Sequence, residues 1–321
     1  MKILANDGIS EAGKIALTQA GYHIITDKVD QAELADFINS EHVDILLVRS
    51  ATTARKELID SCPSLKLIGR GGVGMDNIDV KYAQEKGISV INTPASSSQS
   101  VAELVMGQMY SISRFLHDSY RNLGHGDFNT LKKAYGKGVE LRGKTLGIVG
   151  FGRIGQALAA YALGAGMKVV AVGKEETQIE VEVPVGLDQL VKVSVACGTD
   201  LKEVLPELDY ISLHVPKQAD GSAVLGEEEF NTMKKGVRIV NAARGGVVHE
   251  EALLHALDSG QVAFAALDVF NNEPNPDSRL LNHPKIACTP HIGAATNEAQ
   301  DRIGEELASL IVAEFGTFQE A

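Results

Sequence analysis

The chain has 321 residues, of which 44% are hydrophobic and 22% charged, and this length predicts two globular domains of roughly 100–200 residues each. A formal net charge of −12 argues against a general nucleic-acid binder but does not exclude a locally basic pocket for an anionic substrate. Three scattered cysteines, a polar N-terminus and no apolar run of roughly 20 residues predict a cytoplasmic protein without disulfides, metal site or membrane contact.

Short apolar strands alternate with amphipathic helices along the first hundred residues. The expected strands are "KILA", "YHIIT", "DILLVRS", "LKLIGR" and "ISVINTP". Between the first two we expect a helix with Ser10 as its N-cap and Gly21 as its stop. This alternation predicts a parallel sheet with helices on both faces.

A longer helical pattern spans residues 100–122, and an irregular polar segment, 123–144, follows it. Irregular segments of this length usually have a function or pack against a partner. We therefore expect an arm that is used in dimerisation. The alternative is a flexible linker.

A second alternating series begins at Lys144. Its expected strands are "TLGIVG", "KVVAV", "DYISLHV", "VRIVNAA", "QVAFAALDV" and "PKIACTPH", and a last helix covers 297–315. Residues 174–199 alternate polar and apolar side chains after the second of these strands, which predicts a hairpin-like insertion. A surface elaboration without a role is the alternative for this insertion.

Gly150, Gly152 and Gly155 stand at G-x-G-x-x-G spacing between an expected strand and an expected helix. In such a turn the first glycine permits the tight bend, the second lets the backbone approach a pyrophosphate, and the third lets the helix pack on the strand. The helix N-terminus then offers free N–H groups to phosphates. The motif predicts dinucleotide binding, and glycines that serve packing alone are the alternative.

Three residues with catalytic chemistry, Arg244, Glu273 and His291, follow successive strands of the second series. An arginine between glycines can bind a carboxylate through two parallel hydrogen bonds. A histidine is the usual proton donor or acceptor near neutral pH, and a neighbouring carboxylate fixes its orientation. Because ligands bind beyond the carboxyl ends of parallel strands, we expect a catalytic site there. The alternative for Arg244 is a solvated turn arginine, and a histidine taken alone is more often a surface residue or one whose hydrogen bonds are satisfied within the fold.

Motifs along most of the chain resemble the D-2-hydroxyacid dehydrogenase family, in the family's order. They are "GRGGVGMDNID", "NTPASSSQSVAEL", "GKTLGIVGFGRIG", "LHVP", "NAARGGVVHEEAL", "ALDVFNNEP" and "TPHIGAATNEAQ". The resemblance implies an α/β fold of two Rossmann-like doubly wound parallel-sheet domains. It places an NAD(P)-binding domain at 98–290, inserted into a substrate-binding domain formed by 1–97 and 291–321.

The resemblance also implies a homodimeric NAD(P)-dependent enzyme for a small anionic 2-hydroxy or 2-keto acid. Arg244 would hold the substrate carboxylate, and His291, aligned by Glu273, would exchange the proton. The implied cofactor-binding residues are Gly150, Gly152, Arg153, Ile154, Gly155, Gly173, Lys174, His214, Val215, Pro216, Ala242, Ala243, Asp268, Gly293 and Ala294. The candidate substrate-binding residues are Arg49, Arg70, Gly72, Val73 and Gly74, with Lys132 and Lys133 as further candidates for a phosphate.

The chain departs from the family at the strand end where NAD-using members carry Asp, because it has Gly173 and then Lys174. Loss of the acid removes a ribose contact and the repulsion of a 2′-phosphate, so NADP is open beside NAD. Glu175 or Glu176 could replace the missing acid. The chain also ends soon after the last helix, so regulation through a C-terminal domain is not expected.

The motifs are most similar to the D-3-phosphoglycerate dehydrogenase branch of the family. This predicts conversion of 3-phosphoglycerate to 3-phosphohydroxypyruvate in serine biosynthesis. A hydroxypyruvate or glyoxylate reductase is the alternative within the family. A nucleotide-sensing, corepressor-like scaffold is the alternative of another class.

Overall fold

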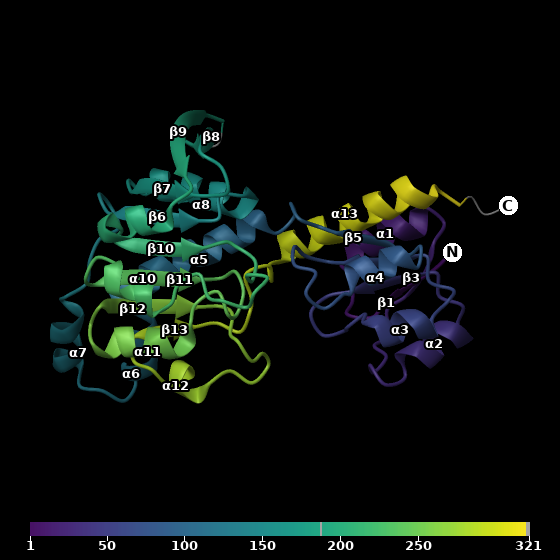
Figure 1. Cartoon of the computed structure of the whole chain (residues 1–321), viewed down its shortest axis with the longest axis horizontal. Helices are drawn as coiled ribbons and strands as arrows, with labels where there is room; N and C mark the ends of the chain where they lie inside the picture. Colours follow the sequence, from purple (N-terminus) through teal and green to yellow (C-terminus); the bar gives the residue numbers. More distant parts are fainter. Residues whose placement is uncertain (187, 319–321) are drawn as a thin grey trace. The chain divides into compact units, whose positions relative to one another are not determined.

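The computed structural model describes residues 1–186 and 188–318 (Figure 1). The chain divides into two compact units, one formed by Met1–Ser98 with the residues from Ala294 onward, the other by Gln99–Gly293. The boundaries expected from the sequence lay at 97/98 and 290/291, one and three residues before these. None of the helices within the described ranges is long and apolar enough to cross a membrane.

The first unit contains a parallel five-stranded sheet in the order β2-β1-β3-β4-β5. Its strands are β1 (Lys2–Ala5), β2 (His23–Ile25), β3 (Ile45–Val48), β4 (Leu67–Arg70) and β5 (Ser89–Asn92). Its helices are α1 (Glu11–Gln19), α2 (Leu34–Ser40), α3 (Lys56–Ser61), α4 (Val80–Glu85) and α13 (Asn297–Phe315). Side chains of α2, α3 and α4 form the core on one face of the sheet, and those of α1 and α13 form the core on the other.

Helix α1 has the boundaries that the sequence predicts. The hydroxyl oxygen of Ser10 accepts the backbone N–H of Gly13 as the N-cap, and Gly21 leaves the helix in the left-handed region, with φ of 86°. A Cβ on Gly13 would lie only 2.6 Å from Cα of Gly304 in α13. The two glycines therefore let the last helix pack closely on the first.

The second unit contains an eight-stranded sheet in the order β13-β12-β11-β10-β6-β7-β9-β8. Its strands are β6 (Thr145–Val149), β7 (Lys168–Val172), β8 (Thr177–Pro184), β9 (Leu190–Gly198), β10 (Tyr210–Leu213), β11 (Val237–Asn241), β12 (Val262–Leu267) and β13 (Ile286–Cys288). All neighbouring strands are parallel except β8 and β9. The strands expected in both series are present, which confirms the predicted α/β class.

Helices cover both faces of this second sheet. Side chains of α5 and α8 belong to the core on one face, and those of α10, α11 and α12 belong to the core on the other. The helices of the unit are α5 (Ser98–Arg114), α6 (Leu116–Asn122), α7 (Phe128–Tyr135), α8 (Arg153–Gly164), α9 (Leu201–Val204), α10 (Glu227–Thr232), α11 (Glu250–Asp258) and α12 (Ser278–Leu281), with a 3₁₀ turn, η1 (Leu205–Glu207).

The prediction of one continuous helix over 100–122 is wrong. The chain breaks between α5 and α6 at Phe115, which has a left-handed φ of 58°. The ring of Phe115 stacks on Tyr135, with 5.5 Å between the ring centroids, and meets Phe264 edge-on at 5.4 Å. These ring contacts accompany a change of direction that helical periodicity does not encode.

The prediction of an irregular segment over 123–144 is also wrong, because it contains α7. Asp127 is the N-cap of this helix, and its carboxylate accepts the backbone N–H of Thr130 at 2.8 Å. At the other end, the hydroxyl of Tyr135 donates to Asp118 of α6 at 2.7 Å. The segment is therefore held to the rest of the unit by specific contacts.

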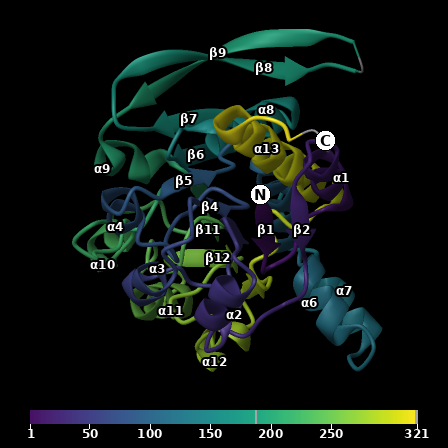
Figure 2. The same cartoon turned by 90° about the vertical axis from the view of Figure 1, so that its right-hand side faces the viewer.

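Strands β8 and β9 form the antiparallel hairpin that the alternation in residues 174–199 predicts (Figure 2). The end of β9 pairs in parallel with the end of β7, with Ala171 opposite Cys197 and Val172 opposite Gly198. The side chains that the hairpin buries against the unit's core are Val181, Val183, Val195 and Cys197. The insertion is therefore an integral edge of the sheet.

Candidate active site

The glycine-rich turn between β6 and α8 uses its three glycines in three different ways. Gly150 has φ of 95°, and a Cβ there would collide with the carbonyl oxygen of His214. A Cβ on Gly155 would collide with the carbonyl oxygen of Gly150, so α8 packs directly on the turn. A Cβ on Gly152, in contrast, would meet nothing within 4 Å. The protein leaves an open approach at Gly152 that its own packing does not require.

This open approach fits a dinucleotide pyrophosphate. It leads to the N-terminus of α8, a helix of 12 residues whose first backbone N–H groups, at Arg153 and Ile154, have no partner within the helix. These groups and the positive end of the helix dipole favour a phosphate. Arg153 is exposed and adds a positive charge. The turn therefore presents N–H groups without helical partners and a positive side chain, which are the features that a phosphate site requires.

Other predicted cofactor residues follow β10, which pairs with β6, and β11, which pairs with β10. The segment after β10 contains His214, Val215 and Pro216, and Nε2 of His214 lies 2.8 Å from the hydroxyl of Ser212. Burial lowers the pKa of His214 to about 4, so its ring is neutral at pH 7. After β11, Ala242 and Ala243 continue the chain, and the N–H of Ala243 donates to the side chain of Asn241 at 3.1 Å. Parallel pairing brings these segments to one edge of the sheet.

The carboxyl end of β7 differs from those of the other strands because it is hydrogen-bonded to the β8–β9 hairpin. The backbone N–H of Gly173 donates to the carbonyl oxygen of Gly198 at 2.8 Å. The next residues, Lys174, Glu175 and Glu176, are exposed. This strand end therefore presents one positive and two negative side chains to solvent.

The side chains of His291 and Glu273 lie within hydrogen-bonding distance of each other. Nδ1 of His291 lies 2.7 Å from Oε2 of Glu273, and Oε1 of Glu273 accepts the backbone N–H of Phe270 at 3.0 Å. Because a carboxylate only accepts hydrogen bonds, Nδ1 is the donor, and Nε2 is left to exchange a proton with a ligand. The two side chains are 38% and 35% exposed, so a ligand can reach them.

Asp268 lies at the end of β12 and is buried. Its carboxylate accepts three hydrogen bonds, from the hydroxyl of Thr289 at 2.6 Å and from the backbone N–H groups of Ile292 and Gly293 at 2.9 Å each. These donors stand on both sides of His291, which has a left-handed φ of 54°. Asp268, expected from the sequence beside the cofactor, thus holds the turn that carries the histidine. A single strand-end aspartate gave no signal for this role.

Arg244 follows β11 and is half-buried. Its Nη1 donates to the carbonyl oxygen of Ala243 at 2.6 Å, and its own carbonyl oxygen accepts a hydrogen bond from Asn241 at 3.0 Å. A Cβ on the next residue, Gly245, would collide with the carbonyl of Phe270. Gly245 therefore lets the segment of Arg244 pack directly on the segment that leads to Glu273.

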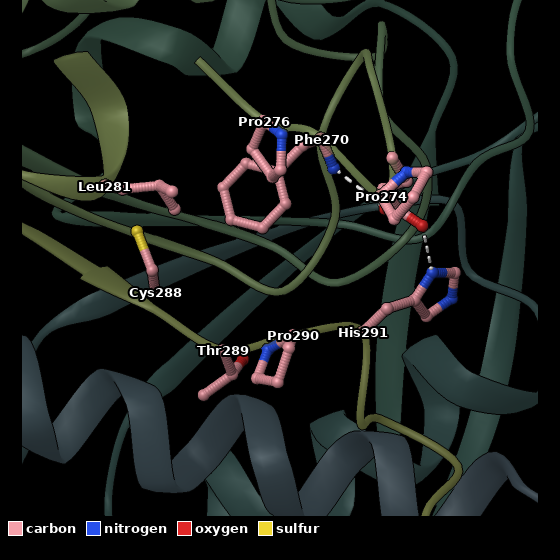
Figure 3. Close-up of a pocket in the computed structure, with 9 residues that line it drawn as sticks. Phe270, Pro274, Pro276, Leu281, Cys288, Thr289, Pro290 and His291 are labelled. Carbon is pink, nitrogen blue, oxygen red and sulfur yellow. Dashed lines mark hydrogen bonds and ion pairs between the residues drawn. The ribbon is translucent and has the colours of Figure 1, made fainter. Parts of the chain in front are cut away.

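A pocket of about 430 Å³ opens beside the His291–Glu273 pair. Figure 3 shows apolar side chains around it. It is lined by Phe270, Glu273, Pro274, Pro276, Leu281, Cys288, Thr289, Pro290 and His291. The sequence did not predict this pocket, because its walls come from β13, α12 and the loop after β12.

The candidate substrate arginines belong to the first unit. Arg49 follows β3, and Arg70 ends β4. The side chain of Asn77 connects the two, because its oxygen accepts from Nε of Arg70 at 3.1 Å and its nitrogen donates to the carbonyl oxygen of Arg49 at 2.7 Å. Neighbouring parallel strands thus bring the two arginines to the carboxyl end of the same sheet.

The glycine-rich segment after β4 offers fewer free N–H groups than the sequence suggested. The N–H of Gly72 donates to the hydroxyl of Thr93 at 2.8 Å and is therefore taken. Val73 is exposed and is followed by Gly74. The other two candidates, Lys132 and Lys133, are exposed on α7 and belong to the second unit.

Comparison with known proteins identifies the family. Residues 106–293 match the family model of the D-isomer specific 2-hydroxyacid dehydrogenase, NAD binding domain. The chain belongs to the D-2-hydroxyacid dehydrogenase family. Within this family it is 43% identical over 321 residues to a hydroxypyruvate reductase of Thermotoga maritima, covering 98% of both chains. It is 40% identical over 311 residues to a D-3-phosphoglycerate dehydrogenase of Methanocaldococcus jannaschii, covering 97% of this chain and 57% of the relative.

Solved structures agree with this membership. The TT0316 protein of Thermus thermophilus superposes with a TM-score of 0.81 at 30% identity, covering 98% of this chain and 97% of that one. The NADPH-dependent glyoxylate/hydroxypyruvate reductase of Sinorhizobium meliloti superposes with a TM-score of 0.78 at 25% identity, covering 100% and 96%. The protein is thus an oxidoreductase that acts on the CH–OH group of a small 2-hydroxy acid and uses NAD or NADP, as the sequence predicted.

Proposed function

We propose that this dehydrogenase is a D-3-phosphoglycerate dehydrogenase, which interconverts 3-phosphoglycerate and 3-phosphohydroxypyruvate. The observation that carries the reaction class is the hydrogen-bonded pair of His291 and Glu273, at the sheet edge that also carries Arg244. The choice of substrate is supported by Arg49 and Arg70, two cations on one edge of the first unit's sheet. Guanidinium groups bind phosphate through paired hydrogen bonds.

The cofactor supplies or accepts the hydride when it is bound, and the protein supplies orientation and proton transfer. We propose that the glycine turn and the N-terminus of α8 hold its pyrophosphate. Arg244 binds the substrate carboxylate and polarises the neighbouring carbonyl. Nε2 of His291 gives a proton to the ketone oxygen during reduction and takes it from the hydroxyl during oxidation. Glu273 keeps Nδ1 protonated and the ring aligned, because its carboxylate accepts the Nδ1–H.

A hydroxypyruvate or glyoxylate reductase is the second candidate. One observation favours it: the Thermotoga maritima relative is named a hydroxypyruvate reductase and matches this chain over almost its whole length, whereas the chain spans about 57% of the Methanocaldococcus jannaschii relative. The same catalytic residues would serve both reactions. The substrate phosphate therefore decides between the two candidates.

The experiment that tests the proposal is a matrix of initial rates. The substrates are 3-phosphohydroxypyruvate, hydroxypyruvate and glyoxylate, each with NADH and with NADPH. We expect the highest kcat/KM with 3-phosphohydroxypyruvate, and we expect Arg49→Gln and Arg70→Gln to reduce it more than they reduce kcat/KM for hydroxypyruvate. Good rates on hydroxypyruvate or glyoxylate with negligible activity on the phosphorylated substrate would select the reductase instead.

We also propose that the protein is a homodimer that associates through α5, α6 and α7. These helices carry exposed large apolar side chains, of which Tyr120 is 93% exposed. The others are Tyr110, Leu116, Leu123 and Phe128. Several large apolar side chains exposed on successive helices are typical of an association surface. Light scattering tests it: the wild type is expected to be dimeric, and Tyr120→Asp with Phe128→Asp is expected to give monomers that retain the wild-type far-UV spectrum.

A further inference from the structure

Position 173 is glycine although its backbone does not demand one. The φ angle of Gly173 lies outside the left-handed region that disfavours other residues, in contrast to Gly150, with φ of 95°. A side chain at this position is excluded for another reason. An ideal Cβ on Gly173 would lie 2.8 Å from Sγ of Cys197, closer than real Cβ contacts.

The thiol of Cys197 cannot readily give way. Cys197 is 5% exposed and belongs to the core together with Val181 and Val195 of the same hairpin. The two backbones are also fixed relative to each other, because Ala171 pairs with Cys197 and the N–H of Gly173 donates to the carbonyl of Gly198 at 2.8 Å. A side chain at 173 therefore requires the hairpin or the sheet edge to move.

The excluded side chain has a known physical role in dinucleotide folds. The end of the strand that follows the glycine-rich helix is where an acid bonds the adenosine ribose hydroxyls and repels a 2′-phosphate. In this chain that strand is β7, and Gly173 is the first residue after it. The residue that would discriminate against NADP is thus missing where the hairpin docks.

We propose that the β8–β9 hairpin sets the cofactor selectivity of this enzyme, because Cys197 takes the space of a side chain at 173 and so keeps a carboxylate away from the ribose 2′-position. The proposal rests on the dinucleotide site of the proposed function. The next residue in the chain is Lys174, whose ammonium group is exposed, and the negatively charged Glu175 and Glu176 follow it. The wild type therefore binds NADPH at least as tightly as NADH.

The steric part of the proposal is tested by a thermodynamic cycle of Gly173→Ala, Cys197→Ala and the double variant. Overpacking makes Gly173→Ala lower the Tm by about 3–10 °C in the wild-type background. In the Cys197→Ala background the same substitution is expected to lower the Tm by less than half as much. Equal losses in both backgrounds would overturn the proposed conflict between Cys197 and a side chain at 173.

The selectivity part is tested by equilibrium titration of NADH and NADPH, followed by nicotinamide fluorescence without substrate. Gly173→Asp with Cys197→Ala is expected to raise the Kd for NADPH relative to that for NADH by at least about tenfold, because the new carboxylate repels the 2′-phosphate. Gly173→Asp alone is expected to lower the Tm and to weaken the binding of both cofactors. Cys197→Ala alone is expected to keep the wild-type ratio of the two Kd values. If Gly173→Asp alone switches the ratio at an unchanged Tm, the hairpin does not control selectivity.

The titration also separates this inference from the proposed function. A wild type that binds neither nucleotide would remove the dinucleotide site and the inference with it. A wild type that binds NADPH and shows the expected cycle, but does not reduce 3-phosphohydroxypyruvate, would overturn only the proposed substrate. A wild type that binds NADH more than about tenfold more tightly than NADPH would overturn the inference and leave the proposed reaction intact.

Discussion

Nδ1 of His291 lies 2.7 Å from Oε2 of Glu273, while the other oxygen of that carboxylate accepts the backbone N–H of Phe270. The backbone bond restrains the carboxylate, and the carboxylate restrains the ring. This arrangement leaves Nε2 as the ring nitrogen that is available for the proposed proton exchange. Glu273 is therefore expected to act through His291, since its own oxygens are engaged.

Substitutions in this pair are expected to lower turnover without unfolding the protein. His291→Ala removes the proton donor and should reduce kcat by about 10²–10⁴-fold. Glu273→Gln leaves the ring but replaces the charged partner, and should reduce kcat by about 10²-fold. The measurement is steady-state kinetics with a thermal melt of each variant.

The double variant provides the control for this pair. Because Glu273 works through His291, His291→Ala with Glu273→Gln should be no slower than His291→Ala alone. A double variant with the product of the two single losses would show that Glu273 acts on the substrate independently.

The turn that carries His291 is expected to depend on Asp268 and Thr289. The hydroxyl of Thr289 donates to Asp268 at 2.6 Å and accepts the side-chain amide of Gln108 at 3.0 Å. Thr289→Val removes both bonds and leaves the buried Asp268 with one donor fewer. We expect kcat to fall by about tenfold with little change in cofactor Kd, because a 1 Å misplacement of a catalytic group is costly. Thr289→Ser keeps the hydroxyl and should restore kcat; a serine variant as slow as the valine variant would refute the role of the hydroxyl.

Two glycines of the turn between β6 and α8 are expected to differ in what alanine changes, namely the Tm at Gly150 and cofactor binding at Gly152. Gly150→Ala forces a side chain into a left-handed conformation and against the carbonyl of His214, so it should lower the Tm by several degrees. Gly152→Ala meets no protein atom within 4 Å and should melt within about 2 °C of the wild type. It should nevertheless weaken NADPH binding at least about tenfold, because the methyl group blocks the approach to α8. Unchanged binding by the Gly152 variant would exclude the turn as the pyrophosphate site.

The stability of the second unit is expected to fall in mild acid because of His214. Burial lowers the pKa of this imidazole to about 4, from 6.5 in the unfolded chain, and Nδ1 has no hydrogen-bond partner among the described residues. Between these values the unfolded chain binds a proton that the folded chain does not, so the free energy of unfolding decreases as the pH falls. The contribution of His214 to the free energy of unfolding is fully present above about pH 6.5 and is lost as the pH falls towards 4.

Urea unfolding at pH 7 and pH 4.5 checks this prediction. His214→Gln should lose about 2–3 kcal/mol less stability between the two pH values than the wild type does. His125→Gln, which changes an exposed histidine of the arm, is the matched control and should behave as the wild type. The same loss in both variants and the wild type would exclude His214 as the acid-sensitive group.

The periodicity of the sequence was sufficient to predict the helices and strands that bury one face. The last helix was expected over 297–315, and α13 has those bounds, because its apolar residues recur at helical spacing and Thr296 provides an N-cap. Helix α5 was expected to continue to residue 122, but Phe115 turns out of the helix to stack on Tyr135. A contact between residues 20 positions apart leaves no mark in local periodicity.

The sequence by itself determined the reaction class, the glycine turn and the residues that we propose for catalysis, since these depend on local spacing and on which residues end which strands. Only the tertiary structure decided which groups contact Asp268 and Gly173. The carboxylate of Asp268 accepts the backbone N–H groups on the C-terminal side of His291, and Cys197 of strand β9 lies against Gly173. The missing acid at 173 is visible in the sequence, but its physical reason is a side chain that only sheet pairing places there.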